Sequence, residues 1–445
     1  MSAAFRTAFR KQRKDKPVLA MLRDYESRNV TYIDPEGAWP IVWETAQGMH
    51  VTDINGKTYL DMTAAFGVAA CGHANRAVVR AGQKQMARLL HAMGDVHPHR
   101  LKAELACKLS QLTFERWSRA KPKRVKGKTI FANSGFEAVE AALKTAALAT
   151  GKSGVACFTG GYHGLGYGAL NVTERQHFRG PFRSQLTEFG AFFPFPKTES
   201  DLAPLREQLT RALSKKSLGA ILVEPLQARG GIHAPPRWFL TTLREFCDEH
   251  DLVLIADEIY TGFGRTGEWF AVEHEKVTPD LICLGKALTG GFPLSACVGS
   301  AELMDRSWPA STGEAIHTST FLGHPVGCAM ALANISELDR RALVKRSREV
   351  GEELIAQLRG LRSRSCVMPV RGRGLMVGLE LNLPDGKPAT AQCLGLIKRL
   401  LHRGFIFLPE GEHANVLAFT PPLIVTTAQL RAAVRAVQEE LEATT

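Results

Sequence analysis

The sequence contains no apolar run that approaches the roughly 18 residues of a membrane-spanning helix. Its nine cysteines are scattered between Cys71 and Cys393 and include no CxxC pair, which argues against a disulfide framework and a zinc cage. His97 and His99 have no acidic or cysteine partners at ligand spacing, so no metal site is expected. Together these absences predict a cytoplasmic protein that neither spans a membrane nor holds a metal ion.

Acidic residues are missing between Arg116 and Lys128, a segment with seven lysines or arginines. A second basic group lies between Arg6 and Lys16, and the chain has a net charge of +12. Nucleic-acid-binding proteins have such segments, but no recognised module accompanies them here. We therefore expect solvated loops, an ordinary basic N-terminal arm, and neither nucleic acid nor a membrane as partner. A nucleic-acid-binding protein remains a remote alternative.

Short apolar runs alternate with helical stretches between residues 128 and 299, which is typical of strand and helix units around a mainly parallel sheet. The runs are continuously apolar, as expected for strands that helices cover on both faces. The expected strands are KTIFA at 128–132, GVACF at 154–158, GAILV at 219–223, LVLIA at 252–256 and LICL at 281–284. After KTIFA, residues 133–149 predict a helix.

The pattern changes from residue 335 onward, where helices and strands alternate less regularly. Helices are expected at 342–361, 393–404 and 426–443, the last opened by a Thr-x-x-Gln capping pattern. Single strands are expected at 370–381, 405–408 and 415–419. Residues 48–62 carry a hairpin signal at Asn55 and Gly56 and are expected to pack nearby. These elements predict a smaller α+β domain.

Lys286 stands in the segment GKALTGG, directly after the apolar run LICL. Burial disfavours the charged form of a lysine and lowers its pKa. An uncharged amine is a nucleophile toward a carbonyl, so Lys286 is a candidate for a covalent bond with a substrate or with pyridoxal phosphate. A lysine that snorkels to the surface is the alternative. Polar or glycine-rich segments follow the other expected strands too, and ligands of open parallel sheets bind at that edge.

Asp257 ends the expected strand LVLIA, where it could cap a turn, bind a metal or pair with a cationic ligand atom. Beside the ring nitrogen of pyridoxal phosphate, a carboxylate keeps the pyridine protonated, so Asp257 and Lys286 form a coherent pair. Ser134 and Glu137 match a capping box at the start of a helix. The same helix start, with Gly135, could also bind a phosphate.

An aromatic ring occurs in the glycine-rich segment TGGYHG, which follows the strand GVACF. Tyr162 could lie flat on a planar cofactor or simply pack in the core. His163, the next residue, could polarise a group or support the loop.

Six segments, taken in order, resemble the landmarks of the class III pyridoxal phosphate-dependent aminotransferases, which include ornithine, acetylornithine and 4-aminobutyrate aminotransferases. The segments are NSGFEAVEAALK, FTGGYHG, VEPLQARGG, IADEIYTGFGRTG, LGKALTGGFPLSA and HTSTFLGHPVGCAMALA. The resemblance implies an α/β fold of type I, with a mainly parallel seven-stranded sheet in a large domain at 61–334. It also implies that residues 1–60 and 335–445 form the smaller α+β domain.

The resemblance implies that Lys286 and Asp257 are the catalytic residues. Lys286 would hold the cofactor as an internal aldimine and move a proton between substrate and cofactor, while Asp257 would pair with the pyridinium nitrogen. The expected cofactor-binding residues are Ser134, Gly135, Tyr162, His163, Glu224, Asp257, Ile259, Lys286 and Thr320, the last reaching the site of the other subunit. The expected assembly is a homodimer, or a dimer of dimers, with shared active sites.

Several positions depart from the pattern of the family. Ala418 stands where an arginine commonly binds the substrate carboxylate, so Glu224 is expected to be left as an unpaired carboxylate. Arg229 or Arg373 could replace the missing arginine. Further departures expected to reshape the pocket are Phe136, Ala228, Arg229 and Tyr260.

The expected activity is transfer of an amino group from an amine, an amino acid or an ω-amino acid donor to a 2-oxo acid acceptor. The departure at Ala418 favours a donor whose reacting amine is not flanked by the usual arginine-held carboxylate, such as a terminal amine, an ω-amino acid or an amino sugar-like compound. A racemase or 2-epimerase on the same scaffold is the alternative, because it needs only a second acid near the cofactor.

Overall fold

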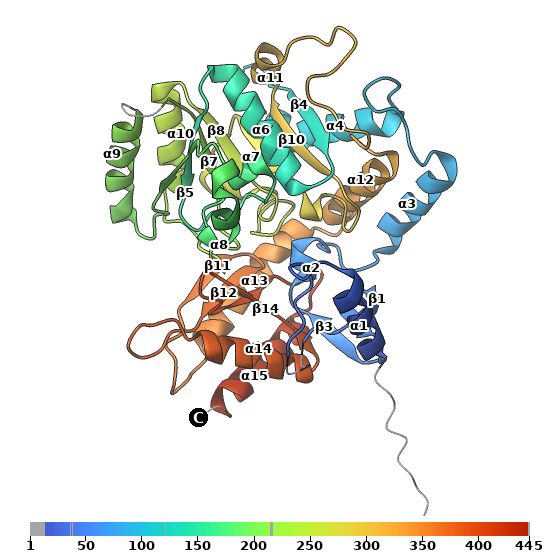
Figure 1. Cartoon of the computed structure of the whole chain (residues 1–445), viewed down its shortest axis with the longest axis vertical. Coiled ribbons are helices and arrows are strands. Elements are labelled where there is room, and N and C mark those ends of the chain that lie inside the picture. Colours follow the sequence, from blue (N-terminus) through green and yellow to red (C-terminus); the bar gives the residue numbers. More distant parts are fainter. Residues whose placement is uncertain (1–13, 36, 38, 121, 214–216, 444–445) are drawn as a thin grey trace, which may run out of the picture.

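The computed structural model describes residues 14–35, 37, 39–120, 122–213 and 217–443. A large sheet flanked by helices occupies the upper part of the molecule in Figure 1, and segments from both chain ends lie together below it. Most of the basic N-terminal arm lies outside the described residues. Within the described part, no helix is long and apolar enough to cross a membrane.

The large sheet has seven strands in the order β4-β10-β9-β8-β7-β5-β6. β10 runs antiparallel to both of its neighbours, and the other neighbouring strands are parallel. The expected mainly parallel, seven-stranded sheet is confirmed. The strands are β4 (Gly127–Ala132), β5 (Gly154–Phe158), β6 (Gly190–Phe193), β7 (Leu218–Val223), β8 (Val253–Asp257), β9 (Leu281–Leu284) and β10 (Ser295–Ser300).

Helices cover both faces of this sheet, so its strands supply two apolar cores. In β5, Val155 and Cys157 face the core beneath α6 (Gly135–Thr150), while Ala156 and Phe158 face the core on the opposite side. That opposite core also receives α4 (Arg100–Leu112), α10 (Phe239–His250) and α12 (Pro325–Arg340). Burial on both sides explains why these strands are continuously apolar in sequence.

The remaining strands form two four-stranded sheets built from the chain ends. β3 (Thr58–Asp61) pairs in parallel with β13 (Phe405–Ile406), so the expected hairpin at 48–62 does join the C-terminal part of the chain. The first sheet also contains β1 (Trp43–Gln47) and β2 (His50–Asp53), and the second contains β11 (Val370–Arg373), β12 (Met376–Glu380), β14 (Leu408–Glu410) and β15 (Val416–Phe419). The boundaries of the two domains stay a prediction.

The single strand expected at 370–381 is wrong, because the segment folds back as the hairpin of β11 and β12. Gly374 forms the turn with a φ of +55°, and a β-carbon there would lie 2.4 Å from the backbone of Thr266. Only glycine fits such a position without strain. The expected C-terminal helices are present as α13 (Leu343–Arg359), α14 (Thr390–His402) and α15 (Thr427–Glu442).

Candidate active site

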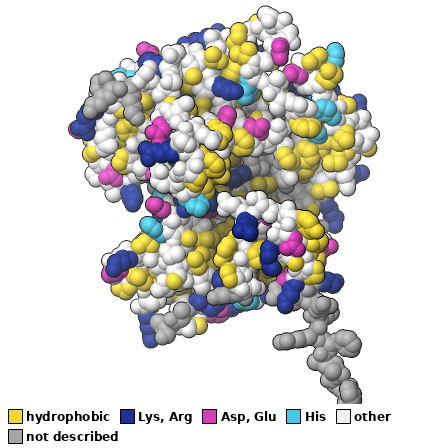
Figure 2. Space-filling model, viewed as in Figure 1, with side chains coloured by type: hydrophobic (Ala, Val, Ile, Leu, Met, Phe, Trp, Pro, Cys, Tyr) yellow, Lys and Arg dark blue, Asp and Glu magenta, His cyan; other side chains and the backbone are white. Residues whose placement is uncertain are grey.

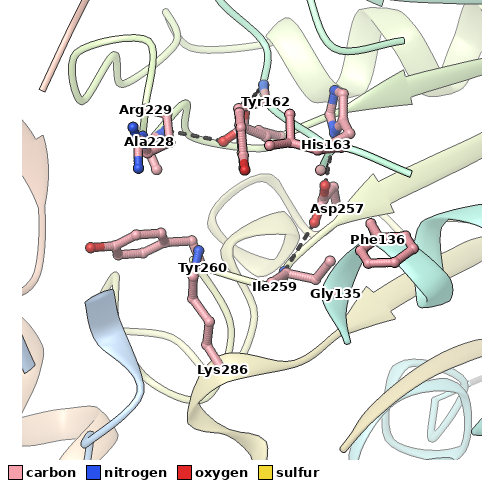
Figure 3. A pocket seen from close by; sticks show the side chains of 13 residues that line it. Gly135, Phe136, Tyr162, His163, Ala228, Arg229, Asp257, Ile259, Tyr260 and Lys286 are labelled. Carbon is pink, nitrogen blue, oxygen red and sulfur yellow. Dashed lines mark hydrogen bonds and ion pairs between the residues drawn. The ribbon is translucent and has the colours of Figure 1, made fainter. Parts of the chain in front are cut away.

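A cavity of about 420 Å³ lies at the carboxyl ends of the strands of the large sheet. Five strands contribute to it, because the segments that follow β4, β5, β7, β8 and β9 all reach its wall. It is lined by Gly135, Phe136, Tyr162, His163, Gly164, Leu165, Glu224, Ala228, Arg229, Asp257, Ile259, Tyr260 and Lys286 (Figure 3). Seven of these are expected site residues, so the sheet brings distant motifs together as its topology predicts.

Lys286 begins a short 3₁₀ turn directly after β9 and projects into the cavity (Figure 3). Its φ of +36° is a left-handed value that a lysine rarely adopts, so packing around the turn must hold it. The Nζ atom lies 3.8 Å from the centroid of the Tyr260 ring. Burial lowers the pKa of Lys286 to about 8, although the charges of Asp257, Glu224 and Glu410 oppose the shift. Folding therefore brings the uncharged amine within reach closer to neutral pH than for an ordinary lysine, and about a tenth of it is uncharged at pH 7.

Asp257 ends β8 and is buried against His163. Its Oδ2 atom lies 2.7 Å from Nδ1 of His163, and Oδ1 accepts the backbone N–H of Ile259 at 3.1 Å. Burial lowers the pKa of His163, but the hydrogen bond and the charge of Asp257 outweigh it and hold the pKa above its ordinary value. The contact with His163 thus fixes the orientation of the Asp257 carboxylate.

The N-terminus of α6 adjoins the cavity through Gly135. Glu137 accepts the backbone N–H groups of Asn133 and Ser134 and also the hydroxyl of Ser134, at 2.7–3.0 Å. The expected capping box is therefore present, but the Ser134 hydroxyl is engaged with Glu137 and does not line the cavity. A β-carbon on Gly135 would lie 3.0 Å from Cδ1 of Ile259, so a larger residue would push Ile259 into the cavity.

Tyr162 and Ile259 lie on opposite sides of the cavity in Figure 3. The backbone N–H of Tyr162 donates to Glu224 at 2.9 Å, which holds the loop after β5 against the end of β7. Both side chains line the cavity, and the expected sandwich of a flat ring between them stays a prediction.

Glu224 is not the unpaired carboxylate that we expected. Its two oxygens accept the backbone N–H groups of Tyr162 and Ala228, at 2.9 and 3.1 Å. Burial nevertheless raises the pKa of Glu224, because these two amides only partly offset the loss of water. The residue thus joins two loops of the cavity wall without needing an arginine.

The residues that depart from the family pattern occupy two places. Phe136, Ala228, Arg229 and Tyr260 line the cavity, whereas Ala418 lies buried on β15 behind Tyr260 and Ala228. Of the two candidate arginines, Arg229 reaches the cavity, and Arg373 lies on β11 outside its wall. Thr320 is exposed on this chain and also lies outside the wall.

Sequence reasoning missed Gly164 and Leu165, which line the cavity, and the charged residue Glu410, which ends β14. Its Oε2 atom lies 3.4 Å from Nε of Arg229, and burial raises its pKa to about 7 although Arg229 and Lys286 oppose the shift. Nothing local to the segment LPEGEH indicates this contact, because it depends on how β14 packs against the loop after β7.

The family model of the class III aminotransferases matches residues 32–441. The acetylornithine aminotransferase of Methanosarcina mazei is 34% identical over 91% of this chain and 92% of its own length. The 5-aminovalerate aminotransferase DavT of Pseudomonas aeruginosa is 35% identical over 88% of this chain and 91% of its own length.

Two solved structures of aminotransferases are similar to this chain along most of its length. An amine transaminase from an uncultivated Pseudomonas species, in a form with bound pyridoxal phosphate, has a TM-score of 0.85 at 27% identity and covers 94% of this chain and 98% of its own. The ornithine aminotransferase of Toxoplasma gondii has a TM-score of 0.83 at 26% identity and covers 98% of this chain and 96% of its own.

Proposed function

The chain belongs to the class III aminotransferases, which use pyridoxal phosphate, and we propose that it moves the amino group of an amine or ω-amino acid to a 2-oxo acid in the cavity around Lys286. The observation that carries this proposal is one cavity holding both a lysine with a pKa of about 8 and a buried Asp257–His163 pair. The relatives reported above are named aminotransferases and give no support to a racemase or a nucleic-acid-binding protein.

The chemistry of the cavity fits pyridoxal phosphate. When bound, this cofactor withdraws electrons from the substrate carbon that carries the amine, which makes the proton on that carbon removable. Lys286 supplies an amine that can attack the cofactor aldehyde and can later carry that proton. Asp257, oriented by His163, offers a carboxylate to the protonated ring nitrogen. The first amides of α6 would bind the phosphate, since they lack intrahelical acceptors.

The two faces of the cofactor ring would contact Tyr162 and Ile259. Glu224 would support Tyr162 through the backbone rather than bind the cofactor itself. Ser134 would position the phosphate-binding amides through its contact with Glu137.

The donor we propose is a terminal amine or an ω-amino acid, whose reacting amine is not flanked by a carboxylate. The wall behind the cavity supports this, because it is apolar where Ala418 lies. The cluster there contains Leu226, Ala228, Ile232, Tyr260, Met376 and Ala418. An α-carboxylate directed at this apolar part of the wall, rather than at Arg229, would lose water without gaining a cationic partner.

A homodimer is the assembly we propose. Apolar side chains are exposed along α3 (Arg76–Arg88) and the segment after it, a region that appears yellow on the right of Figure 2. The exposed residues include Val79, Met86, Leu89, Leu90, Met93 and Val96. Exposed apolar patches of this kind mark association surfaces. Thr320, exposed on one chain, would reach the phosphate site of the other.

We also propose a cytoplasmic location. All nine cysteines are free thiols, and eight of them are buried. Unpaired thiols persist in a reducing compartment.

Half-reactions test the proposed activity. Cofactor-loaded protein is given 1-aminobutane, 5-aminopentanoate or alanine with no acceptor, and the loss of visible absorbance is followed together with the carbonyl product. We expect the first two donors to react faster than alanine. Faster reaction with alanine would contradict the donor class, and loss of optical activity without a carbonyl product would favour a racemase.

A further inference from the structure

The cavity wall contains two side chains of the lysine and arginine type, Lys286 and Arg229. Lys286 is committed to the cofactor in the proposed function, which leaves Arg229 as the cation available to a substrate. Figure 3 shows Arg229 and Asp257 at opposite ends of the cavity, with Tyr162 above and the Lys286 side chain extending into the cavity from below. The guanidinium carbon of Arg229 lies 5.4 Å from the centroid of the Tyr162 ring. A substrate joined near Lys286 can therefore extend toward Arg229.

Arg229 retains most of its hydrogen-bonding capacity. A guanidinium has five N–H donors arranged to fit a planar carboxylate. Among the described residues, the buried Nε of Arg229 has no hydrogen-bond partner, and the side chain is 34% exposed. This combination of a cavity position, a full charge and unused donors is what a carboxylate ligand requires.

Glu410 fixes one edge of this arginine. Its carboxylate is 7% exposed and lies 3.4 Å from Nε of Arg229, close enough to attract the guanidinium without forming a hydrogen bond. The backbone reinforces the contact, because the N–H of Gly411 donates to the carbonyl of Arg229 at 3.2 Å. The two terminal nitrogens of the guanidinium remain outside this contact.

We propose that Arg229 binds the carboxylate of the 2-oxo acid acceptor, and that Glu410 is the positioning residue that holds Arg229 in place. This inference rests on the proposed function. Arg373 is the other arginine considered, and it stays half-buried on β11 beside Glu275, outside the cavity wall. In this protein the arginine that binds the acceptor carboxylate would then lie in the loop after β7, and not on β15, where Ala418 stands.

The test uses two acceptors that differ in the carboxylate. Pyruvate carries it, and butanone replaces it with an ethyl group. The aminated form of the enzyme is prepared with 1-aminobutane, and the return of visible absorbance is followed with each acceptor. Binding of pyruvate to the cofactor-loaded enzyme is measured separately by calorimetry. The variants are Arg229→Gln and Arg229→Lys, with Arg373→Gln as the control of matched charge.

We expect Arg229→Gln to raise the KM for pyruvate and weaken its binding by about tenfold or more, since a charge-assisted contact is lost. The rate with butanone and the half-reaction with 1-aminobutane are expected to change by a much smaller factor than the KM for pyruvate. Arg229→Lys is expected to recover part of the loss, because it restores the charge without the planar donor pair. Glu410→Gln is expected to raise the KM for pyruvate by a larger factor than it changes the half-reaction with 1-aminobutane.

An unchanged KM for pyruvate in Arg229→Gln, or an equal rise in Arg373→Gln, would overturn the assignment. A lower KM in Glu410→Gln would show that Glu410 competes with the substrate for Arg229 and does not position it. If the wild-type protein fails to react with 1-aminobutane, the proposed function fails instead, so the two failures are distinguishable.

Discussion

Lys286 is the residue whose ionisation determines whether the site can work. Its pKa falls from 10.5 to about 8 on folding without cofactor, so the folded chain loses this proton at a pH where the unfolded chain still holds it. The stability of the cofactor-free protein is therefore expected to rise with pH between about 8 and 10.5, and the full penalty of burying the ammonium applies below this window.

Lys286→Met removes the free-energy cost of burying the Lys286 ammonium. At pH 7 the cofactor-free variant is expected to be more stable than the wild type by at most about 3 kcal/mol, because the amine is partly accessible from the cavity and the full shift overstates the cost. The difference is expected to shrink toward pH 10. Urea unfolding at both pH values measures it, with the exposed Lys84→Met as the control. A difference that does not depend on pH would contradict the ionisation of Lys286 described here.

Local chemistry was enough to predict the central residues of the site, and the family resemblance supplied others such as Glu224 and Ile259. Lys286, Asp257, Tyr162 and Gly135 each follow an apolar strand, and the edge of a parallel sheet brings them together. The contact between Arg229 and Glu410 could not be predicted this way, because it joins segments that are far apart in sequence and belong to different sheets. The partners of Glu224 were missed for a related reason, since they are backbone amides, which no residue type reveals.

At the level of elements, the start of α6 connects the fold to cofactor binding. Glu137 accepts three hydrogen bonds there, so Glu137→Ala is expected to lower the free energy of unfolding by about 1 kcal/mol. It is also expected to weaken retention of pyridoxal phosphate, because the amides that would face the phosphate lose their support. Glu137→Gln keeps an acceptor and is the matched control. Urea unfolding measures the loss of stability, and dialysis against buffer without cofactor measures the loss of retention. If Glu137→Ala retains pyridoxal phosphate as well as the wild type does, the helix cap does not contribute to cofactor binding.

Elements with a strong local signal were predicted, and elements fixed by tertiary packing were not. Five strands of the large sheet and the turn at Asn55 and Gly56 are evident in the sequence. β6 and β10 were missed because glycine, alanine or serine makes up at least half of each strand, which weakens the apolar signal. The hairpin of β11 and β12 was missed because its turn at Gly374 is set by the close approach of Thr266.

For the whole molecule, shared active sites predict that two defective chains can complement each other. Lys286→Ala removes the amine, and Thr320→Glu places a negative charge where the other subunit's cofactor phosphate would lie. A mixed dimer then has one site with both residues intact and one with neither. Its activity is expected to be about half that of the wild-type dimer, while each variant alone is nearly inactive.

Co-expression of the two variants with different affinity tags yields the mixed dimer. A dimer of Lys286→Ala with the double variant is the control, because it contains no intact site. If Thr320→Glu alone is fully active, or if the purified mixed dimer is inactive, Thr320 does not act across the interface.

The most direct test of the central claim is to locate the bond between the protein and its cofactor. Protein loaded with pyridoxal phosphate is reduced with borohydride, digested, and mapped by mass spectrometry. We predict that the phosphopyridoxyl group is found on the peptide that contains Lys286 and is absent from Lys286→Ala. A label on a different lysine, or no label on protein that retains the cofactor and transfers amino groups, would contradict the role given to Lys286.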